Sequence, residues 1–527
     1  MPKYLVRAEA VSFDDFIFGT NDISTIRGGG MLLRDALNAS AILTDLGTVY
    51  VGGSTGLFEA DWPEGAVENR CEAIRRELQS GQRAEAVFVV SACQWDGQNR
   101  TFPAQHAEVA ARSRWRQLQT PTMVVPKPGE RPCEVDRLRP AVEPIDRKGA
   151  AVLTGQKKRM WVSSVTKTRR EYGVEQKFGH YQEIYRKVYP GEKLQYAEFT
   201  NDFEQIADRP EAGRLDGKIA LIHLDGNKFG EILRGCSNPE VLGHWAETLE
   251  GNWNGFLAWL LREPKQRDWL WSGKVISNAG VERMKFDAFR IETLLWGGDE
   301  VWLAVPAWKG WWVLEKFFKL YGTLGPNQAT SFDPLDGRGV RPLSFGGSLI
   351  FAHYNAPIQR LRKLTEVLSG QAKEQYNKQN PRHTFVYQVL ESFDHLGSAV
   401  EDARDRIVGD HRALVLDGAD MANVRAAIGD LKKWIPRSRL HAAVKKIGGG
   451  EMEAFLEEYK KTAERAELGL SDGEKHRLTK ALQDLAACSA KALPGAPEEI
   501  KKATSWLHLL EMWDYIPETA AGAGGIR

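Results

Sequence analysis

The sequence predicts an α+β fold: two ferredoxin-like units of strands and helices, separated by a connector and followed by an all-helical C-terminal domain. Three observations predict it. Strand-like apolar segments alternate with helical patterns in residues 1–96 and again in residues 214–395. Prolines and basic stretches interrupt this pattern in residues 97–213. From residue 396 to residue 527 strand signals fade, and apolar residues recur at helical spacing.

The first unit has the predicted order β-α-β-β-α-β, which is the ferredoxin-like or palm arrangement. Expected strands lie near residues 4–8, 48–50, 57–60 and 86–92, and expected helices follow residues 14 and 63. Gly52, Gly53 and Ser54 stand between the second and third strands, where such a glycine cluster predicts a hairpin turn.

The connector contains repeated prolines and two basic stretches, residues 157–159 and 167–170. We expect basic loops here. Such loops would contact RNA or a partner subunit, or would simply be solvated.

The second unit has the predicted order β-α-α-β-β-α-β-α. Expected strands lie near residues 219–224, 289–295, 301–305 and 343–352, and expected helices near residues 241–261, 308–320 and 358–376. Trp308, Trp311 and Trp312 are close together in one of these helices. Core packing is the favoured role of these rings, and stacking on RNA bases is the alternative.

The composition is that of an ordinary folded protein, with 42% hydrophobic and 27% charged residues. The formal net charge is +1, so a nucleic-acid surface would have to be a local patch. No run of about 18 apolar residues is present, and the N-terminus lacks the apolar core of a signal peptide. The five cysteines form no CxxC pair. We therefore expect a cytoplasmic protein with reduced thiols and no membrane partner.

Acidic residues end or follow two apolar strands of the second unit. Asp225 stands at the end of one, and Asp299 and Glu300 follow Gly297 and Gly298 at the turn after another. If the strands are neighbours, Asp225 and Asp299 face each other at the edge of the sheet. Carboxylate oxygens are the ligands that Mg²⁺ prefers. An exposed hairpin turn is the alternative for the Gly-Gly-Asp-Glu sequence alone.

These segments resemble a known catalytic core. Residues 222–230 (IHLDGNKFG) and 295–300 (LWGGDE) are similar to the palm shared by GGDEF-type diguanylate cyclases and the large polymerase-cyclase subunit of type III CRISPR effector complexes, Cmr or Csm type. Residues 345–357 (FGGSLIFAHYNAP) resemble that subunit's Ala-His-Tyr-x-x-Pro strand. Residues 12–18 and 26–33 resemble its first palm, which a diguanylate cyclase lacks.

The resemblance implies a nucleotidyltransferase or cyclase that makes cyclic oligoadenylate from ATP, in antiviral defence, when its complex recognises target RNA. Asp225, Asp299 and Glu300 would be the catalytic acids. Together with the Gly226 carbonyl they would bind two Mg²⁺ or Mn²⁺ ions, which activate a ribose 3′-hydroxyl. Lys373 matches the phosphate-binding lysine of the cyclase palms, and a solvated lysine at a helix end is its alternative.

Further residues are expected to contact the nucleotide, the first palm contributing its hairpin to a composite site. They are Asn227, Lys228, Phe229, Gly297, Gly298, Gly52, Gly53 and Ser54. A turn or cap role is the alternative for Asn227, and a plain hairpin turn for the Gly-Gly-Ser trio. For His353 and Tyr354, packing within the palm is favoured over contact with the base or ribose.

The sequence departs from the family pattern in three places. Glu300 replaces the second Asp of the usual Gly-Gly-Asp-Asp motif. The chain contains no His-Asp dipeptide, so we expect no HD nuclease domain. Residues 133–141 look like a degenerate remnant of the family's zinc ribbon, and we expect no zinc there.

Three functions remain open from the sequence. One is an enzyme within a CRISPR ribonucleoprotein, with other effector subunits, guide RNA and target RNA as partners. The second is a free-standing cyclic nucleotide synthase. The third is a catalytically silent scaffold subunit, against which the retention of Asp225 and Asp299 argues.

Overall fold

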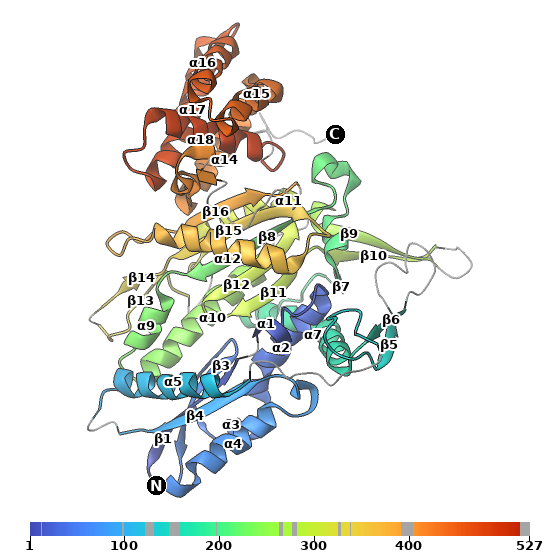
Figure 1. Cartoon of the computed structure of the whole chain (residues 1–527), viewed down its shortest axis with the longest axis vertical. Helices are drawn as coiled ribbons and strands as arrows, with labels where there is room; N and C mark the ends of the chain where they lie inside the picture. The colour runs from blue at the N-terminus through green and yellow to red at the C-terminus, as the bar shows by residue number, and fades with distance from the viewer. Residues whose placement is uncertain are drawn as a thin grey trace.

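The computed structural model describes residues 1–11, 13–96, 100–121, 131–146, 159–196, 198–262, 267–276, 282–324, 328–337, 339–391, 404–405 and 407–516. Ser12 and the basic residues Lys157 and Lys158 lie outside these ranges. An N-terminal sheet lies at one end of the molecule, a larger sheet in the centre and a group of helices at the other end (Figure 1). None of the described helices is both long enough and apolar enough to cross a membrane.

The N-terminal sheet consists of β1 (Lys3–Ala10), β2 (Gly47–Gly52), β3 (Thr55–Asp61) and β4 (Phe88–Gln94). Its order is β2-β3-β1-β4, with antiparallel neighbours. Alternate residues of β1 enter two core clusters, one shared with α2 (Ile23–Ala39) and α4 (Val67–Leu78), the other with α5 (Phe102–Gln119). The order β-α-β-β-α-β predicted for this part of the chain is therefore present.

The central sheet has the order β11-β12-β8-β15-β16-β17. Its strands are β8 (Lys218–Gly226), β11 (Glu292–Gly297), β12 (Glu300–Pro306), β15 (Phe345–His353), β16 (Thr384–Val389) and β17 (Leu416–Asp417). The helices α10 (Pro239–Arg262) and α11 (Ala307–Leu320) pack with Ala220, Ile222 and Leu224 of β8. The helix α12 (Ile358–Glu374) packs on the other face, with Ile219 and Leu221.

The two sheets share one strand pattern and one register. Strands β11-β12-β8-β15 repeat the order of β2-β3-β1-β4. Both β2 and β11 are six residues long, and each has a register irregularity after its second residue. The Ala10 amide donates to the Ser54 carbonyl at 2.9 Å, and the Gly226 amide donates to the Asp299 carbonyl at 2.9 Å. Ser54 therefore occupies the place of Asp299, and Glu9 that of Asp225.

The two sheets also exchange helix contacts. The first helix of the N-terminal unit, α2, packs against β11 of the central sheet. In return α10 packs against β2, and a Cβ atom on Gly243 would lie 2.9 Å from the Val49 carbonyl oxygen. This reciprocal packing places the β2–β3 hairpin beside the β11–β12 hairpin.

The basic stretch at residues 167–170 is helical, which corrects the prediction of a loop. It belongs to α7 (Ser164–Val188), whose first turn is capped by the Ser163 side chain accepting from the Thr166 amide. No proline interrupts this segment. The helices α7 and α2 cross closely, because a Cβ atom on Gly173 would lie 2.2 Å from the Ser24 carbonyl oxygen. The crossing buries Arg169, so that part of the basic stretch lies in the core.

The predicted strand at residues 289–295 is also corrected. Phe289 ends β10 (Glu282–Phe289), which pairs with β9 (Leu270–Ile276) in a separate small sheet, and β11 starts only at Glu292. Polar residues in both β9 and β10 hide the alternation that identifies a strand.

The described part of the C-terminal region after β17 is helical, as predicted. Its long helices are α14 (Met421–Trp434), α15 (Arg437–Gly448), α16 (Met452–Glu467), α17 (Asp472–Ala492) and α18 (Glu498–Glu511). Phe455, Leu485 and Trp506 are buried among them. The Tyr387 hydroxyl of β16 lies 2.7 Å from Nδ1 of His508, which joins the central sheet to α18.

Candidate active site

Two of the three predicted acids lie on neighbouring strands, and the third lies in the turn just before one of them. Asp225, near the end of β8, pairs directly with Glu300 at the start of β12. Asp299 precedes Glu300, and its carbonyl accepts from the Gly226 amide at 2.9 Å. The strands β8 and β12 are therefore neighbours, as the sequence prediction for Asp225 and Asp299 required.

The carboxylate of Asp225 acts on that of Asp299. Burial and the negative charge of Asp225 raise the pKa of Asp299 above its usual value. The Lys373 ammonium of α12 forms an ion pair with Asp225. Gly346, the partner of Asp225 on β15, leaves room for it, because a Cβ atom there would lie 2.4 Å from Cγ of Lys373. The site is thus a pair of like charges held beside one lysine.

Glu300 is held differently. Its Oε1 lies 2.8 Å from Nε2 of His223 and accepts from Nε1 of Trp302 at 2.7 Å. Burial acts to raise the pKa of Glu300, but the hydrogen bonds from His223 and Trp302 outweigh it and leave the pKa below its usual value. One carboxylate oxygen of Glu300, where the sequence departs from the family motif, therefore already has two hydrogen-bond partners in the central sheet.

Glycines bring the two hairpin tips together. Gly297 and Gly298 have φ values of 136° and 65°, and Gly53 has a φ of 60°, which L side chains rarely adopt. A Cβ atom on Gly297 would lie 3.6 Å from the Cα atom of Gly53. The Trp253 indole donates to the Gly298 carbonyl at 2.9 Å and fixes the turn. The first sheet thereby contributes backbone to the surroundings of Asp299.

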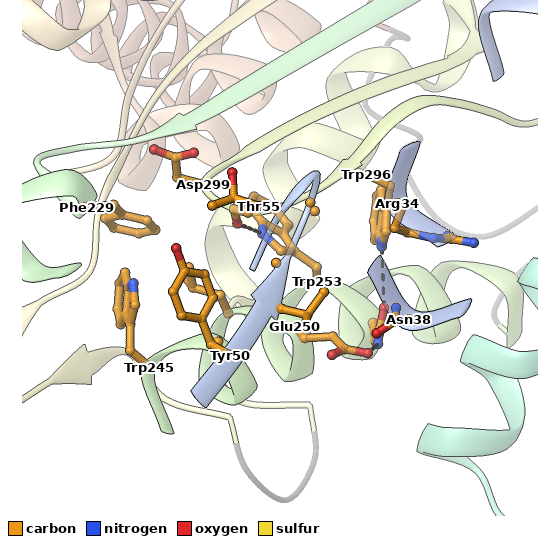
Figure 2. A pocket seen from close by; sticks show the side chains of 18 of the residues that line it. Arg34, Asn38, Tyr50, Thr55, Phe229, Trp245, Glu250, Trp253, Trp296 and Asp299 are labelled. Atoms are coloured by element: carbon orange, nitrogen blue, oxygen red, sulfur yellow. Dashed lines mark hydrogen bonds between the residues drawn. The ribbon is translucent and has the colours of Figure 1, made fainter. Parts of the chain in front are cut away.

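Two cavities flank the tips, and Asp299 borders both. The larger has a volume of about 350 Å³ and the smaller about 230 Å³. The larger reaches between the first sheet, α7 and α10, and Figure 2 shows aromatic rings gathered along its wall. These rings are Tyr50, Phe229, Trp245, Trp253 and Trp296. Its size falls within the range of small-molecule sites.

The other predicted nucleotide contacts divide between cavity and scaffold. Gly52 and Gly53 line both cavities, Ser54 lines the smaller one and Phe229 the larger one. Asn227 is buried, and its side-chain amide donates to Oγ of Ser344 at 3.0 Å, which favours the turn role.

Lys228 is largely exposed and has a φ of 60° just before α9 (Phe229–Gly235). Its ammonium lies 3.4 Å from Glu231, one turn into that short helix. It borders neither of the two cavities.

His353 and Tyr354 lie away from the acids. In the pairing of β15 with β8, Phe345 stands opposite Gly226 while His353 stands opposite Lys218, at the other end of the strand. They therefore lie at the far end of the strand from the acids, with His353 exposed and Tyr354 partly buried. The tryptophans of α11 pack in the core, since Trp311 is buried and Trp312 stacks on Trp259.

Sequence reasoning missed most of the cavity walls. Residues of α2, α7 and α10 line them, including Arg34, Asn38, His180, Trp245 and Trp253. No motif spacing connects helices that lie so far apart in the chain. The tryptophans of α10 were visible in the sequence, but their periodicity is also that of a core helix.

Residues 133–139 form a turn held by a carboxylate. Asp136 accepts hydrogen bonds from the Leu138 and Arg139 amides at 2.9 and 3.0 Å and from the Thr166 hydroxyl at 2.7 Å. Asp136 thus organises the turn that we likened to a zinc ribbon.

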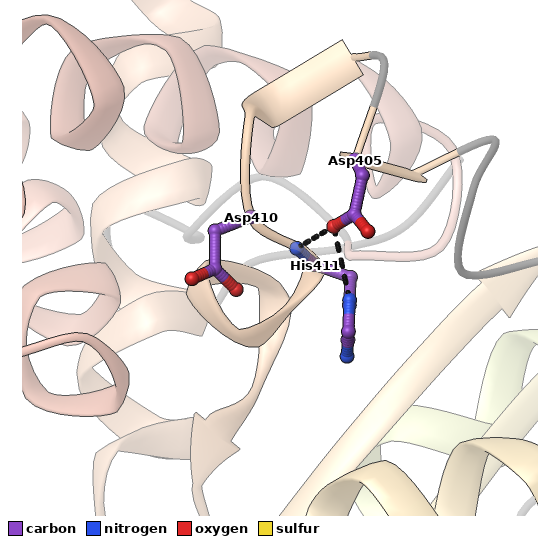
Figure 3. Close-up of side chains that lie close together, drawn as sticks. All are labelled: Asp405, Asp410 and His411. Carbon is purple, nitrogen blue, oxygen red and sulfur yellow. Dashed lines mark hydrogen bonds and ion pairs between the residues drawn. The ribbon is translucent and has the colours of Figure 1, made fainter.

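One group of residues in the described part of the chain has the ligand spacing of a metal site: Asp405, Asp410 and His411 (Figure 3). Asp405 already accepts from Nδ1 of His411, and Asp410 pairs with Arg412. The group lies outside both cavities.

No protein-family model matches the chain, and no curated protein matches its sequence. Solved structures do match. The crystal structure of an apo Csm1-Csm4 cassette has a TM-score of 0.43 at 13% identity, over 75% of this chain and 55% of that one. Csm1 in T. onnurineus has a TM-score of 0.42 at 13% identity, over 72% and 52%.

A Csm1-Csm4 cassette in complex with cA4 has a TM-score of 0.41 at 13% identity, over 77% of this chain and 58% of that one. Another similar structure is a Csm1-Csm4 subcomplex of the type III-A CRISPR-Csm interference complex. This chain covers 52–58% of the length of the three chains compared. We base the functional assignment on the residues of the site and not on this likeness.

Proposed function

We propose that the chain is a metal-dependent nucleotidyltransferase built on two palm domains, which makes cyclic oligoadenylate from ATP. On this proposal it works in the cytoplasm as a subunit of a type III CRISPR effector complex, with guide RNA, and responds to target RNA in antiviral defence. The sequence motifs around Asp225 and Asp299, and the geometry that joins them, support it.

One observation carries the proposal: the charge of Asp225, at the end of β8, acts on the carboxyl of Asp299, in the turn before the neighbouring β12, and Asp299 borders a cavity. The pKa of Asp299 is raised by burial and by Asp225, so a cation between them would relieve a repulsion that the fold maintains. Hard oxygen ligands of this kind fit Mg²⁺ or Mn²⁺. When bound, such ions supply charge that stabilises the phosphate and the attacking hydroxyl.

The chain's own residues have defined tasks. Asp225 and Asp299, with the Gly226 carbonyl, would hold the metal ions. Lys373 now compensates Asp225, and it would turn to the triphosphate when that charge is taken by metal. Gly297 and Gly298 have positive φ values, at which any other residue would be strained. Because neither carries a side chain, a nucleotide would be able to approach the backbone there.

A silent scaffold is the second candidate, and a specific observation favours it. Oε1 of Glu300 is held by His223 and Trp302. If turnover requires both oxygens of this fourth residue, the palm is inactive. The free-standing synthase uses the same site and differs only in its trigger.

The test is turnover. The purified chain, alone and with candidate guide and target RNA, is incubated with Mg²⁺ or Mn²⁺ and each labelled nucleoside triphosphate. An Asp225→Ala and Asp299→Ala double variant is compared with a control pair on the exposed side of α16, Glu457→Ala and Glu464→Ala.

The proposal predicts an oligoadenylate product from ATP that the control pair makes and the acid pair does not. Dependence on RNA would assign the chain to a ribonucleoprotein, and independence to a free-standing synthase. If no triphosphate is consumed under any condition, the scaffold function replaces the proposal.

A further inference from the structure

The carboxylate of Glu300 is bound further into the central sheet than its own backbone. Glu300 stands opposite Asp225 in the pairing of β12 with β8, and the next pair on the same face is Trp302 with His223. Both of these rings bind Oε1 of Glu300, the imidazole at 2.8 Å and the indole at 2.7 Å. The two donors lie two residues further from the turn than Glu300, so its side chain is drawn along the strands, away from Asp299.

The ligand oxygens of the three acids do not come together. In the described part of the chain, only the Asp405 group of Figure 3 has ligand atoms all within 4.8 Å of one another. Asp225, Asp299 and Glu300 lack that spacing, although Asp225 and Glu300 are directly paired. The Cβ atoms of directly opposed residues are about 5 Å apart, a distance that a glutamate side chain can span. The orientation of Glu300, and not its place in the sheet, therefore keeps it apart.

The His223 side chain has Glu300 as its one hydrogen-bond partner among the described residues. It is 2% exposed, and its Nδ1 is buried without a partner there. Because a carboxylate only accepts, Nε2 of His223 carries the hydrogen of this bond. The ring also packs on the indole of Trp302, with the ring centroids 4.8 Å apart. Burial of an imidazole costs free energy, which the bond to Glu300 offsets.

The first sheet shows that this strand pattern does not require the two donors. At the matching position of β1 and β3, the opposed residues are Arg7 and Leu57. Thr55 stands where Glu300 does, so there is no carboxylate for such a pair to hold. The imidazole and the indole are therefore features of the central sheet alone, together with the acid that they bind.

We infer that His223 and Trp302 are positioning residues that hold Glu300 outside the metal site, so that Asp225 and Asp299 bind the cation without it. The inference rests on the proposed function, because it concerns the metal site of that proposal. The number of charged ligands sets the affinity of an oxygen site for a hard cation. Loss of either donor would free Glu300 to turn toward Asp225 and supply a third carboxylate, so the two donors lower the affinity of the site.

The experiment measures the binding of Mn²⁺ alone to the full chain by calorimetry near neutral pH. Glu300→Gln tests whether Glu300 is already a ligand. His223→Phe and Trp302→Phe each remove one donor and keep an aromatic ring. Trp271→Phe of β9 is the control, because this indole donates to Oδ2 of Asp208 at 2.9 Å in the same way, outside the site. Circular dichroism checks that each variant is folded.

We expect Glu300→Gln alone to change the Mn²⁺ dissociation constant by less than about twofold. His223→Phe and Trp302→Phe should each tighten binding by about 3- to 10-fold, because a third carboxylate joins the site. Adding Glu300→Gln to either variant should remove this gain, which a general effect on packing would not do. Trp271→Phe should leave binding unchanged. If one of the donor variants does not fold, the other decides the question.

Two results would overturn the inference. If Glu300→Gln alone weakens Mn²⁺ binding by more than about fivefold, Glu300 is already a ligand and is not held away. If the folded donor variants bind Mn²⁺ no more tightly than the wild-type chain, His223 and Trp302 do not restrain it. Failure of the proposed function gives a different result. The wild-type chain would then show no Mn²⁺ binding that Asp225→Asn with Asp299→Asn removes, and the inference would fail with it.

Discussion

The β2–β3 hairpin of the first sheet and the β11–β12 hairpin of the central sheet have the same backbone geometry but carry different side chains at their turns. They share strand length, register irregularity and the closing hydrogen bond. Where the central hairpin has Gly297-Gly298-Asp299-Glu300, the first has Gly52-Gly53-Ser54-Thr55. The acids are therefore not a requirement of this turn, because the same turn forms with two hydroxyl residues in their place.

The strands beside the hairpins differ in the same way. Glu9 stands where Asp225 does, but Arg7 donates to it at 3.1 Å from within the same strand. Asp225 instead pairs with Lys373, which comes from a separate element, α12. In the first sheet the acid is paired within its own strand, and in the central sheet it is paired with a side chain from another element. The comparison separates the features that form the sheet, which both hairpins share, from the acidic residues that only the central sheet carries at its turn.

The largest effect should come from the acids. On the proposed function, Asp299→Asn should lower turnover by about 10³-fold, equivalent to ~4 kcal/mol of transition-state stabilisation, because it would remove a metal ligand. Glu9→Gln, the matched change in the first sheet, should leave the rate within about threefold. Initial rates of oligonucleotide formation measure both. Equal losses in the two variants would contradict the division of labour between the sheets.

Two glutamates elsewhere in the two sheets should differ next. Glu292 is fully buried between Arg27 and Lys177, so Glu292→Gln should cost about 3–5 kcal/mol of unfolding free energy. Glu59 of the first sheet pairs with Lys3 at the surface, and Glu59→Gln should cost less than about 1 kcal/mol. Denaturant titration followed by tryptophan fluorescence compares them. If Glu292→Gln lowers the unfolding free energy no more than Glu59→Gln does, the cluster of Arg27, Lys177 and Glu292 does not hold the two units together.

The turn glycines give a smaller contrast. Gly297→Ala should cost about 2–3 kcal/mol, because a φ of 136° is strained for any side chain. Gly53→Ala, with a φ of 60° and open space at the Cβ position, should cost about 1 kcal/mol. Thermal unfolding of the two variants gives the order, and the reverse order would mean that the tips are shaped by something other than backbone conformation.

The smallest effect concerns pH. The folded-state pKa of Asp299 is raised, so its ionisation lowers stability as the pH rises through that pKa. Asp299→Asn should therefore raise the melting temperature at pH 7 by roughly 1–3 °C. This gain should shrink as the pH falls and the wild-type carboxyl becomes protonated. Ser54→Ala should show no such pH dependence, and a gain that persisted at low pH would assign the effect to packing instead.

Much of the sheet architecture was accessible from sequence because it depends on local signals. The apolar run before Asp225, the glycines before Asp299 and the helical spacing of Leu361, Leu364 and Leu368 each act over a few residues. The helix α7 was missed because it is polar and is stabilised by close crossing with α2 at Gly28 and Gly173, which periodicity does not reveal.

The candidate site was only half accessible for the same reason. Asp225, Asp299 and Lys373 stand in short motifs whose residue types indicate metal and phosphate binding. Arg34 and His180 stand 146 residues apart in the chain and meet only because two helices cross. Sequence spacing carries no information about such a pair, so this part of the cavity wall required the structure.

The matched register has a consequence for how this chain can change over time. An added or lost residue in β2, β3, β11 or β12 would turn every following side chain to the opposite face of its sheet. Added residues are therefore tolerated only in segments outside these paired strands. The β9–β10 ribbon lies between α10 and β11 and pairs outside the central sheet, so its length does not affect the register that places Asp299.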